Sequence, residues 1–183
     1  MKRGDAMCII ETSPVIETRR LTLRAPGLQD VTRLARLANE SEIARMTLRM
    51  PHPFGVGDAE AFVLQTAAQD PARSATFVIE HEDHGLVGVL GLFEDADPAP
   101  EAGYWIGRDF WGRGFATEAL EAGMVWASRK WRRRALMAGH FADNPASGRV
   151  LEKAGFLYTG EVRKGYSKAR GQEVATRRMV WLA

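Results

Sequence analysis

The chain has 183 residues, of which 45% are hydrophobic, so it is long enough to bury one full core and short for two domains. Lysine plus arginine number 25 and aspartate plus glutamate 23, and the formal net charge of +2 gives no reason to expect a nucleic-acid partner. The single cysteine, Cys8, excludes a disulfide within the chain and fits a reducing compartment, so we expect a cytoplasmic protein.

The N-terminal segment begins like a targeting signal but lacks the length of one. Lys2 and Arg3 precede an apolar run that stops at Glu11, which is too short for the hydrophobic region of a signal peptide. No other apolar stretch approaches the length that crosses a bilayer, so we expect no membrane span. Met1 and Met7 are both candidate start positions.

The first part of the chain predicts one strand and two helices. Alternating polar and apolar residues predict a strand over 20–24, and the 3.6-residue spacing that follows predicts a helix over 28–39. Asp58 is predicted to cap a second helix that runs to about Gln69. The apolar face of the first helix consists of Val31, Leu34, Leu37 and Ala38.

The remaining chain alternates β-rich and helical segments, with no linker long enough to separate two domains. Two β-rich runs, 75–80 and 86–94, are joined by "HEDHG" and predict a hairpin in which Gly85 takes a positive φ. The pattern predicts a single α/β domain over residues 1–183. Its further elements are predicted as strand 101–106, helix 115–130, strand 135–141, a helix from about Pro145, and strands 156–162 and 174–182.

The segment "AGYWIGRDFWGRGFATEA" joins a strand to a helix through a glycine-spaced turn. Gly112 and Gly114 lack Cβ atoms, so consecutive backbone N–H groups can approach a phosphate at the positive end of the next helix dipole. A P-loop is excluded because Arg113 stands where lysine is needed and Gly114 replaces the magnesium-binding serine or threonine. A dinucleotide fingerprint fits poorly, since Thr117 replaces its third glycine. The turn predicts a ligand that bears a pyrophosphate.

Two segments, "GYWIGRDFWGRGFATEAL" and, one strand later, "ADNPASGRVLEKAGF", strongly resemble the GCN5-related N-acetyltransferase (GNAT) superfamily, and within it the branch of ribosomal-protein alanine N-acetyltransferases. The entry "TRRLTLRAPGLQD" resembles that branch's first strand and helix. The resemblance covers residues 16–182 and leaves residues 1–15 as an N-terminal extension, expected to be flexible. The second segment carries the family's residues at the family's spacing, namely Asn144, Ser147, Lys153, Gly155 and Phe156.

The resemblance implies a mixed, twisted, mostly antiparallel sheet with flanking helices, in which strands 101–106 and 135–141 splay apart. Acetyl-CoA would lie between them as acyl donor, with its pantetheine arm on the unpaired strand backbones and its pyrophosphate on the amides of 112–116. Trp111 departs from the family pattern, which often has glutamine or arginine there. The residues expected to bind the donor are Trp105, Ile106, Gly107, Trp111, Gly112, Arg113, Gly114, Phe115, Ala116, Thr117, Asn144 and Ser147.

Transfer from a thioester to an amine needs a base for the ammonium proton and an acid for the leaving thiolate. Glu101 matches the position of the presumed base in related enzymes, acting through a water; the alternative is a solvated carboxylate at a strand end. Many members use a tyrosine as the acid, but this chain has Leu151 there, and Ser147 is either its replacement or a residue that only helps to start the helix. Asn144 is likewise either a helix cap or a contact to the pantetheine arm. A backbone N–H near Ile106 is implied as the donor to the thioester carbonyl.

The acceptor is the least determined part of the site. The resemblance implies direct transfer to a primary amine, on a protein N-terminus or a small molecule, and leaves a homodimer open. Phe54, Trp105 and Tyr166 are candidate walls of the acceptor pocket. The four histidines have no partners at metal-binding spacing, so no metal is expected. The alternative from a different class is a module that binds acyl-CoA as a sensor or assembly domain without catalysis.

Overall fold

The computed structural model describes residues 14–94 and 99–183, so Cys8, both candidate start positions and most of the extension 1–15 lie outside the described residues. The strands are β1 (Ile16–Glu17), β2 (Leu21–Arg24), β3 (Ser74–His81), β4 (Gly85–Phe93), β5 (Glu101–Ile106), β6 (Ala135–Phe141), β7 (Leu157–Ser167) and β8 (Gln172–Leu182). The helices are α1 (Val31–Ala38), α2 (Ser41–Ala44), α3 (Val56–Ala67), α4 (Phe115–Lys130) and α5 (Pro145–Lys153), with 3-10 turns at Leu28–Asp30 and Arg108–Phe110.

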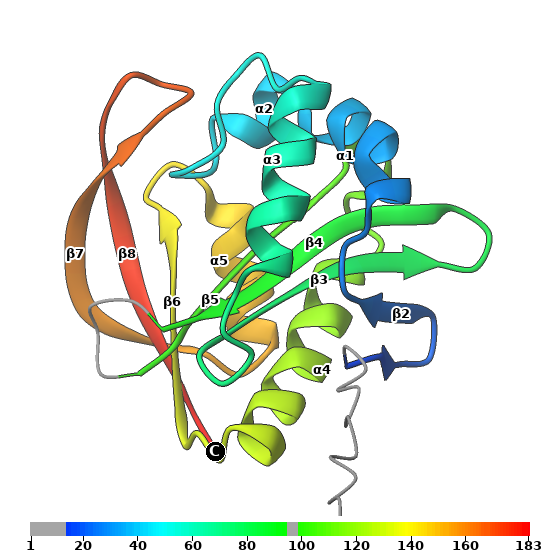
Figure 1. Cartoon of the computed structure of the whole chain (residues 1–183). Coiled ribbons are helices and arrows are strands. Elements are labelled where there is room, and N and C mark those ends of the chain that lie inside the picture. Colours follow the sequence, from blue (N-terminus) through cyan, green and yellow to red (C-terminus); the bar gives the residue numbers. More distant parts are fainter. Residues whose placement is uncertain (1–13, 95–98) are drawn as a thin grey trace, which may run out of the picture.

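The strands form one sheet in the order β1-β2-β3-β4-β5-β6-β8-β7 (Figure 1). Neighbouring strands are antiparallel except β5 and β6, which run parallel. β5 pairs with β4 over its whole length, but with β6 only through Glu101 to Met137 and Ala102 to Ala138. Beyond these pairs the two central strands diverge. The mixed, mostly antiparallel sheet with splayed central strands confirms the expected fold class.

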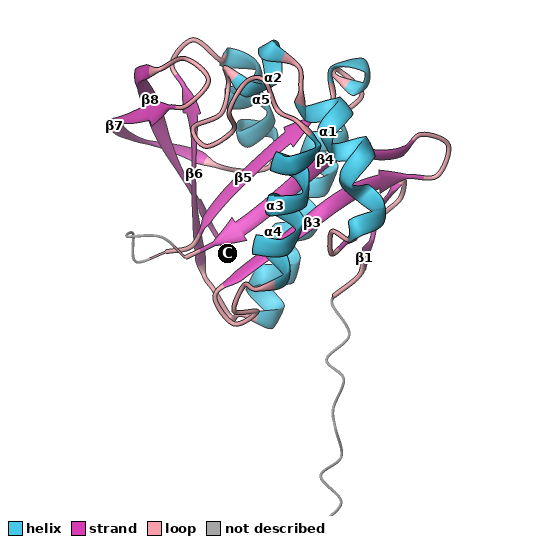
Figure 2. Ribbon diagram, turned by 45° about the horizontal axis from the view of Figure 1, so that its top comes forward, coloured by secondary structure: helices cyan, strands magenta, loops and turns pink. Residues whose placement is uncertain are grey.

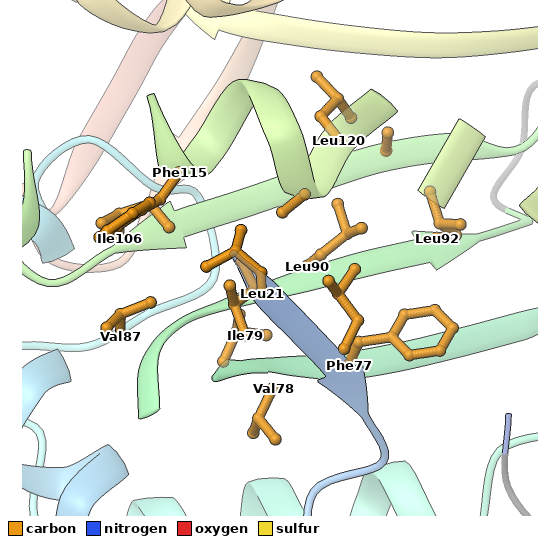
Figure 3. Close-up of a cluster of buried hydrophobic side chains, with 14 of the residues drawn as sticks. Leu21, Phe77, Val78, Ile79, Val87, Leu90, Leu92, Ile106, Phe115 and Leu120 are labelled. Atoms are coloured by element: carbon orange, nitrogen blue, oxygen red, sulfur yellow. The ribbon is translucent and has the colours of Figure 1, made fainter. Parts of the chain in front are cut away.

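Helices cover both faces of the sheet, with α1 and α3 on one side and α4 and α5 on the other (Figure 2). α4 approaches the sheet closely because Gly123 has no side chain; a Cβ there would come within 2.5 Å of a methyl carbon of Leu90. The core between them gathers apolar side chains from β3, β4 and α4, among them Phe77, Leu90 and Leu120, each at most 1% exposed (Figure 3). This packing supports β4, the strand with which β5 pairs over its whole length.

The apolar face predicted for the first helix is confirmed, since its four residues are all buried in α1. The predicted start of α3 was wrong by three residues. α3 begins at Val56 with Gly55 as its N-cap, and Asp58 occupies the third helical position instead. From there its Oδ2 accepts a hydrogen bond from the Gly55 N–H at 2.8 Å, so the aspartate still stabilises the helix start by satisfying an orphan amide.

The predicted hairpin forms between β3 and β4, and Gly85 has φ +63°, as expected for its tight turn. The last two strands are longer than predicted, and β7 contains an irregularity between Tyr158 and Val162, where Gly160 has φ +82°. The short helix α2 was not predicted, since four residues are too few for a periodic signal. Within 14–94 and 99–183, no helix is long and apolar enough to span a membrane.

Candidate active site

The gap between β5 and β6 presents unpaired backbone groups of β5. The N–H of Gly107 donates to the carbonyl oxygen of Val87 at 2.8 Å. This bond identifies Gly107 as a residue whose backbone groups point toward β4. Because these groups alternate along an antiparallel strand, the N–H and C=O of Tyr104 and Ile106 face away from β4, toward the gap. Of these groups, the Ile106 carbonyl oxygen accepts a hydrogen bond from a tryptophan side chain. An extended, amide-containing chain can bond there like an added strand.

The glycine-spaced turn has the backbone geometry of an anion site. Gly112 has φ +74° and Gly114 φ +80°, both in the left-handed region that disfavours side chains. Gly114 is the N-cap of α4, which begins at Phe115. A Cβ at Gly112 would have no neighbour within 4 Å, so the space beside this backbone is open. The first amides of a 16-residue helix therefore face an open space that a phosphate can enter.

Trp111, the departure from the family pattern, closes the turn against β5. Its indole Nε1–H donates to the carbonyl oxygen of Ile106 at 2.7 Å. Trp111 is 49% exposed and lines the cavity described below. The side chain thus satisfies a carbonyl in the strand gap and links the glycine-spaced turn to the strand that it follows.

A polar cluster that the sequence did not predict fixes the turn from the outside. Arg20 Nη1 donates to the carbonyl oxygen of Arg113 at 3.0 Å, and Arg20 Nε donates to Glu118 Oε2 at 2.7 Å. Thr18 Oγ1 donates to Glu118 Oε1 at 2.7 Å. Burial alone would raise the pKa of Glu118, but the hydrogen bonds from Thr18 and Arg20 outweigh it and hold the pKa below its ordinary value.

One cavity of about 1110 Å³ connects the turn, the strand gap and the space under α2 and α3. Among the predicted donor-binding residues, Gly107 and Arg113 are not in its lining. Gly107 packs on Leu37, 3.1 Å from its missing Cβ, and the side chain of Arg113 extends to His84, with 3.1 Å between Nη1 and Nε2. The predicted residues that line the cavity are Glu101, Trp105, Ile106, Trp111, Gly112, Gly114, Phe115, Ala116, Thr117, Asn144 and Ser147.

Glu101 enters the cavity at the start of β5 and is held by an arginine. Its Oε2 accepts a hydrogen bond from Arg178 Nη1 at 2.8 Å, and the arginine side chain is only 6% exposed. Arg178 belongs to β8 and lies beside Gly139 of β6, whose missing Cβ would be 3.5 Å from Nη1. The carboxylate is therefore anchored across the sheet rather than freely solvated at a strand end.

Ser147 and Asn144 meet at the first turn of α5. Asn144 is its N-cap, with Oδ1 accepting from the Ser147 N–H at 3.1 Å, and Pro145 follows at the first helical position. The Ser147 hydroxyl lies 2.9 Å from the hydroxyl of Tyr104, a residue that the sequence reasoning did not select. Leu151, at the position of the family's usual tyrosine, is 1% exposed and packed in the core.

The part of the cavity away from the turn is lined by glycines and aromatic side chains. Its floor includes Gly91 and Gly103, which face each other across β4 and β5, and its walls include Phe54, Phe62 and Trp105. The third predicted wall residue, Tyr166, is 61% exposed on β7. It does not belong to the described residues that line the cavity. No group of three metal-ligating side chains occurs in the part of the chain that the structure describes.

A family model described as an acetyltransferase (GNAT) domain matches residues 20–157. Two similar curated proteins come from bacilli. The uncharacterized N-acetyltransferase p20 of Bacillus licheniformis is 24% identical over 159 residues, covering 85% of this chain and 88% of the relative. The uncharacterized N-acetyltransferase YoaA of Bacillus subtilis (strain 168) is 29% identical over 161 residues, covering 82% and 87%.

Solved structures share the fold at low identity. RimJ of Mycobacterium smegmatis in complex with CoA-disulfide has a TM-score of 0.79 and 21% identity, covering 94% of this chain and 88% of that chain. The microcin C7 self immunity acetyltransferase MccE in complex with acetyl-CoA and AMP has a TM-score of 0.78 and 19% identity, covering 91% and 94%. The ribosomal-protein-S5-alanine acetyltransferase of Vibrio fischeri has a TM-score of 0.78 and 18% identity, covering 92% and 96%. With the family model spanning most of its length, the chain belongs to the GNAT acetyltransferases and is an acetyl-CoA-dependent N-acetyltransferase.

Proposed function

We propose that the enzyme transfers the acetyl group directly to the primary amine of a protein or peptide N-terminus, with Glu101 as base and Ser147 as acid. The observation that carries this proposal is that both side chains line the one cavity that also contains the phosphate turn and the strand gap. A direct transfer needs all four parts at one place, because thioester, amine, base and acid react together.

Each part has a role in this scheme. The pantetheine arm bonds the backbone groups of Tyr104 and the N–H of Ile106, and the pyrophosphate rests on the amides after Gly112. A backbone N–H of β5 stabilises the developing charge on the thioester oxygen. The ammonium group loses one proton to Glu101 through a water, and the neutral amine attacks the carbonyl carbon. The nitrogen of the tetrahedral intermediate then releases its second proton to water. As the C–S bond breaks, the sulfur takes its electron pair and the Ser147 hydroxyl supplies the proton.

The charges around the acceptor favour a monoamine over a polyamine. Among the described residues, the carboxylates that line the cavity already have partners: Glu42 pairs with Arg108 at 3.2 Å, Asp143 with Arg170 at 2.7 Å and Glu101 with Arg178 at 2.8 Å, while Asp58 accepts from the Gly55 N–H at 2.8 Å. A polyamine needs several spaced carboxylates that are free to pair with it. A peptide N-terminus carries one ammonium group and an amide backbone, which suits a cavity whose carboxylates are already engaged and whose walls include aromatic side chains.

We further place the protein in the cytoplasm, on the strength of its single cysteine, and treat the whole chain as one catalytic domain. The cosubstrate is present there, and protein N-termini emerge there during synthesis. A homodimer stays a proposal that gel filtration with light scattering would decide.

The test uses acetyl-CoA with a peptide that has a free N-terminal alanine, and spermidine as the competing acceptor. We expect the peptide to be acetylated faster, and Glu101→Gln to lower kcat about 100-fold without changing the Kd for acetyl-CoA. Glu161→Gln is the matched control, because Glu161 is also paired with an arginine but lies outside the cavity, on β7. Preferential acetylation of spermidine would overturn the proposal that a peptide N-terminus is the acceptor. An unchanged kcat in Glu101→Gln would overturn the proposal that Glu101 is the base.

A further inference from the structure

Tyr104 brings a second hydroxyl to Ser147 from the opposite side of the strand gap. Its Oη lies 2.9 Å from Ser147 Oγ and 3.2 Å from the Ser147 carbonyl oxygen, and both side chains line the cavity. Tyr104 comes from β5, whereas Ser147 comes from α5, so the contact spans the two elements that border the donor site.

These distances allow two hydrogen-bond arrangements. In the first, Tyr104 donates to the Ser147 carbonyl oxygen and Ser147 Oγ donates to Tyr104, so no proton points into the cavity. In the second, Tyr104 donates to Ser147 Oγ, which leaves the serine proton free to point at a sulfur atom. The two arrangements differ only by rotation of two hydroxyl groups, which heavy-atom positions do not fix.

We propose that Tyr104 is a positioning residue for the acid, donating to Ser147 Oγ so that the serine proton is aimed at the leaving sulfur. This inference rests on the role proposed above for Ser147. In the transfer, the sulfur takes the electron pair of the C–S bond and the Ser147 proton. The Ser147 oxygen is stabilised by the hydrogen bond from Tyr104 and regains, through water, the second proton released by the acceptor nitrogen, and Tyr104 keeps its own.

The surroundings of Tyr104 suit a permanent donor. Burial raises the pKa of Tyr104 to about 12, although the hydrogen bond with Ser147 acts in the opposite direction. The phenol therefore stays protonated at physiological pH. Since Leu151 leaves α5 without the family's usual phenol, the strand supplies a phenol from the other side of the gap.

The first test measures the ionisation of the CoA thiol in the complex, by the ultraviolet absorbance of its thiolate, and needs no acceptor. Donors aimed at the sulfur stabilise the thiolate, so we expect Ser147→Ala to raise the pKa of the bound thiol by about one unit and Tyr104→Phe by about half a unit. Tyr158→Phe is the control, because the Tyr158 hydroxyl also lies against α5, 3.0 Å from His140 Nε2, but outside the cavity lining. Tyr158→Phe should leave the pKa of the bound thiol unchanged.

The second test separates positioning from packing through a double-variant cycle on kcat with acetyl-CoA and the alanine peptide. We expect Tyr104→Phe to lose about tenfold in kcat with an unchanged KM for acetyl-CoA, and to lose nothing further when Ser147 is already alanine. Two results would overturn the inference about Tyr104 but leave the role of Ser147 intact. One is a double variant in which the two losses in kcat multiply; the other is a pKa of the bound thiol that shifts in Ser147→Ala but not in Tyr104→Phe. An unshifted thiol in both variants would overturn the role of Ser147 as well.

Discussion

Arg178 Nη1 donates to Glu101 Oε2 at 2.8 Å, and this pair ties β8 to the first residue of β5. The arginine side chain is 6% exposed and the glutamate side chain 20%, so the pair is largely removed from water. Such a pair gives the carboxylate one orientation, and the loss of either partner leaves a charge in a poorly solvated place. It is therefore both a structural anchor and the support of the proposed base.

We predict that Arg178→Met lowers the free energy of unfolding by about 3 kcal/mol and lowers kcat, because the carboxylate loses its partner inside the cavity. Urea unfolding followed by circular dichroism measures the first effect. Arg163→Met removes an ion pair with Glu161 that is almost half exposed on both sides, and should cost less than about 1 kcal/mol. Equal losses in the free energy of unfolding in the two variants would contradict the role of Arg178 as the buried partner of Glu101.

The indole of Trp111 is predicted to contribute to donor binding by holding the phosphate turn on β5. Trp111→Phe removes the donor to the Ile106 carbonyl, and we expect the Kd for acetyl-CoA to rise about fivefold, the equivalent of one hydrogen bond. Trp131→Phe is a matched control, since the Trp131 indole donates to the Pro71 carbonyl at 3.0 Å and lies outside the cavity. A similar rise in both variants, measured by titration calorimetry, would refute the role of Trp111.

Acid should weaken the anchoring of the turn through Glu118. Its pKa is lower in the folded chain than the ordinary value of 4.5, so its contribution to stability is fully present well above 4.5 and is lost as the pH falls through the folded-state value. We expect Glu118→Gln to be less stable than wild type by about 1–2 kcal/mol at pH 7. This difference should narrow as the pH falls from about 5, in urea unfolding at a series of pH values. A stability difference between wild type and Glu118→Gln that stays constant with pH would contradict this role of Glu118.

Local pattern predicted most of the fold and most of the selected residues that line the cavity. The apolar spacing of α1, the turn at Gly85 and the glycine-spaced turn are each encoded within a few neighbouring residues, and the resemblance placed the splayed strands. The start of α3 was wrong because Asp58 can stabilise a helix from the N-cap or from the third position, and the sequence does not distinguish them.

The polar contacts that complete the site connect distant parts of the chain. Arg20 meets Glu118 and Glu101 meets Arg178 across separations of 98 and 77 residues. The chain has 25 lysines and arginines, and no local pattern selects the partner of a given carboxylate. Tyr104 was likewise passed over, because its hydroxyl gains meaning only once α5 is packed beside β5. Partner choice of this kind depends on the assembled sheet.

Titration calorimetry of acetyl-CoA into wild type and two glycine variants tests the central claim most directly, namely that the turn before α4 holds the donor. Gly114 and Gly160 have φ of +80° and +82°, so Gly114→Trp and Gly160→Trp carry the same backbone strain. Only Gly114 lines the cavity. We predict that wild type and Gly160→Trp bind alike, and that Gly114→Trp binds at least about 100-fold more weakly. A Cβ at Gly114 would lie 3.4 Å from Arg20 Nη2, so the indole displaces the arginine that holds the turn and disrupts the amides expected to bind the pyrophosphate. Undiminished binding by a folded Gly114→Trp protein, or no binding by wild type, would contradict the account.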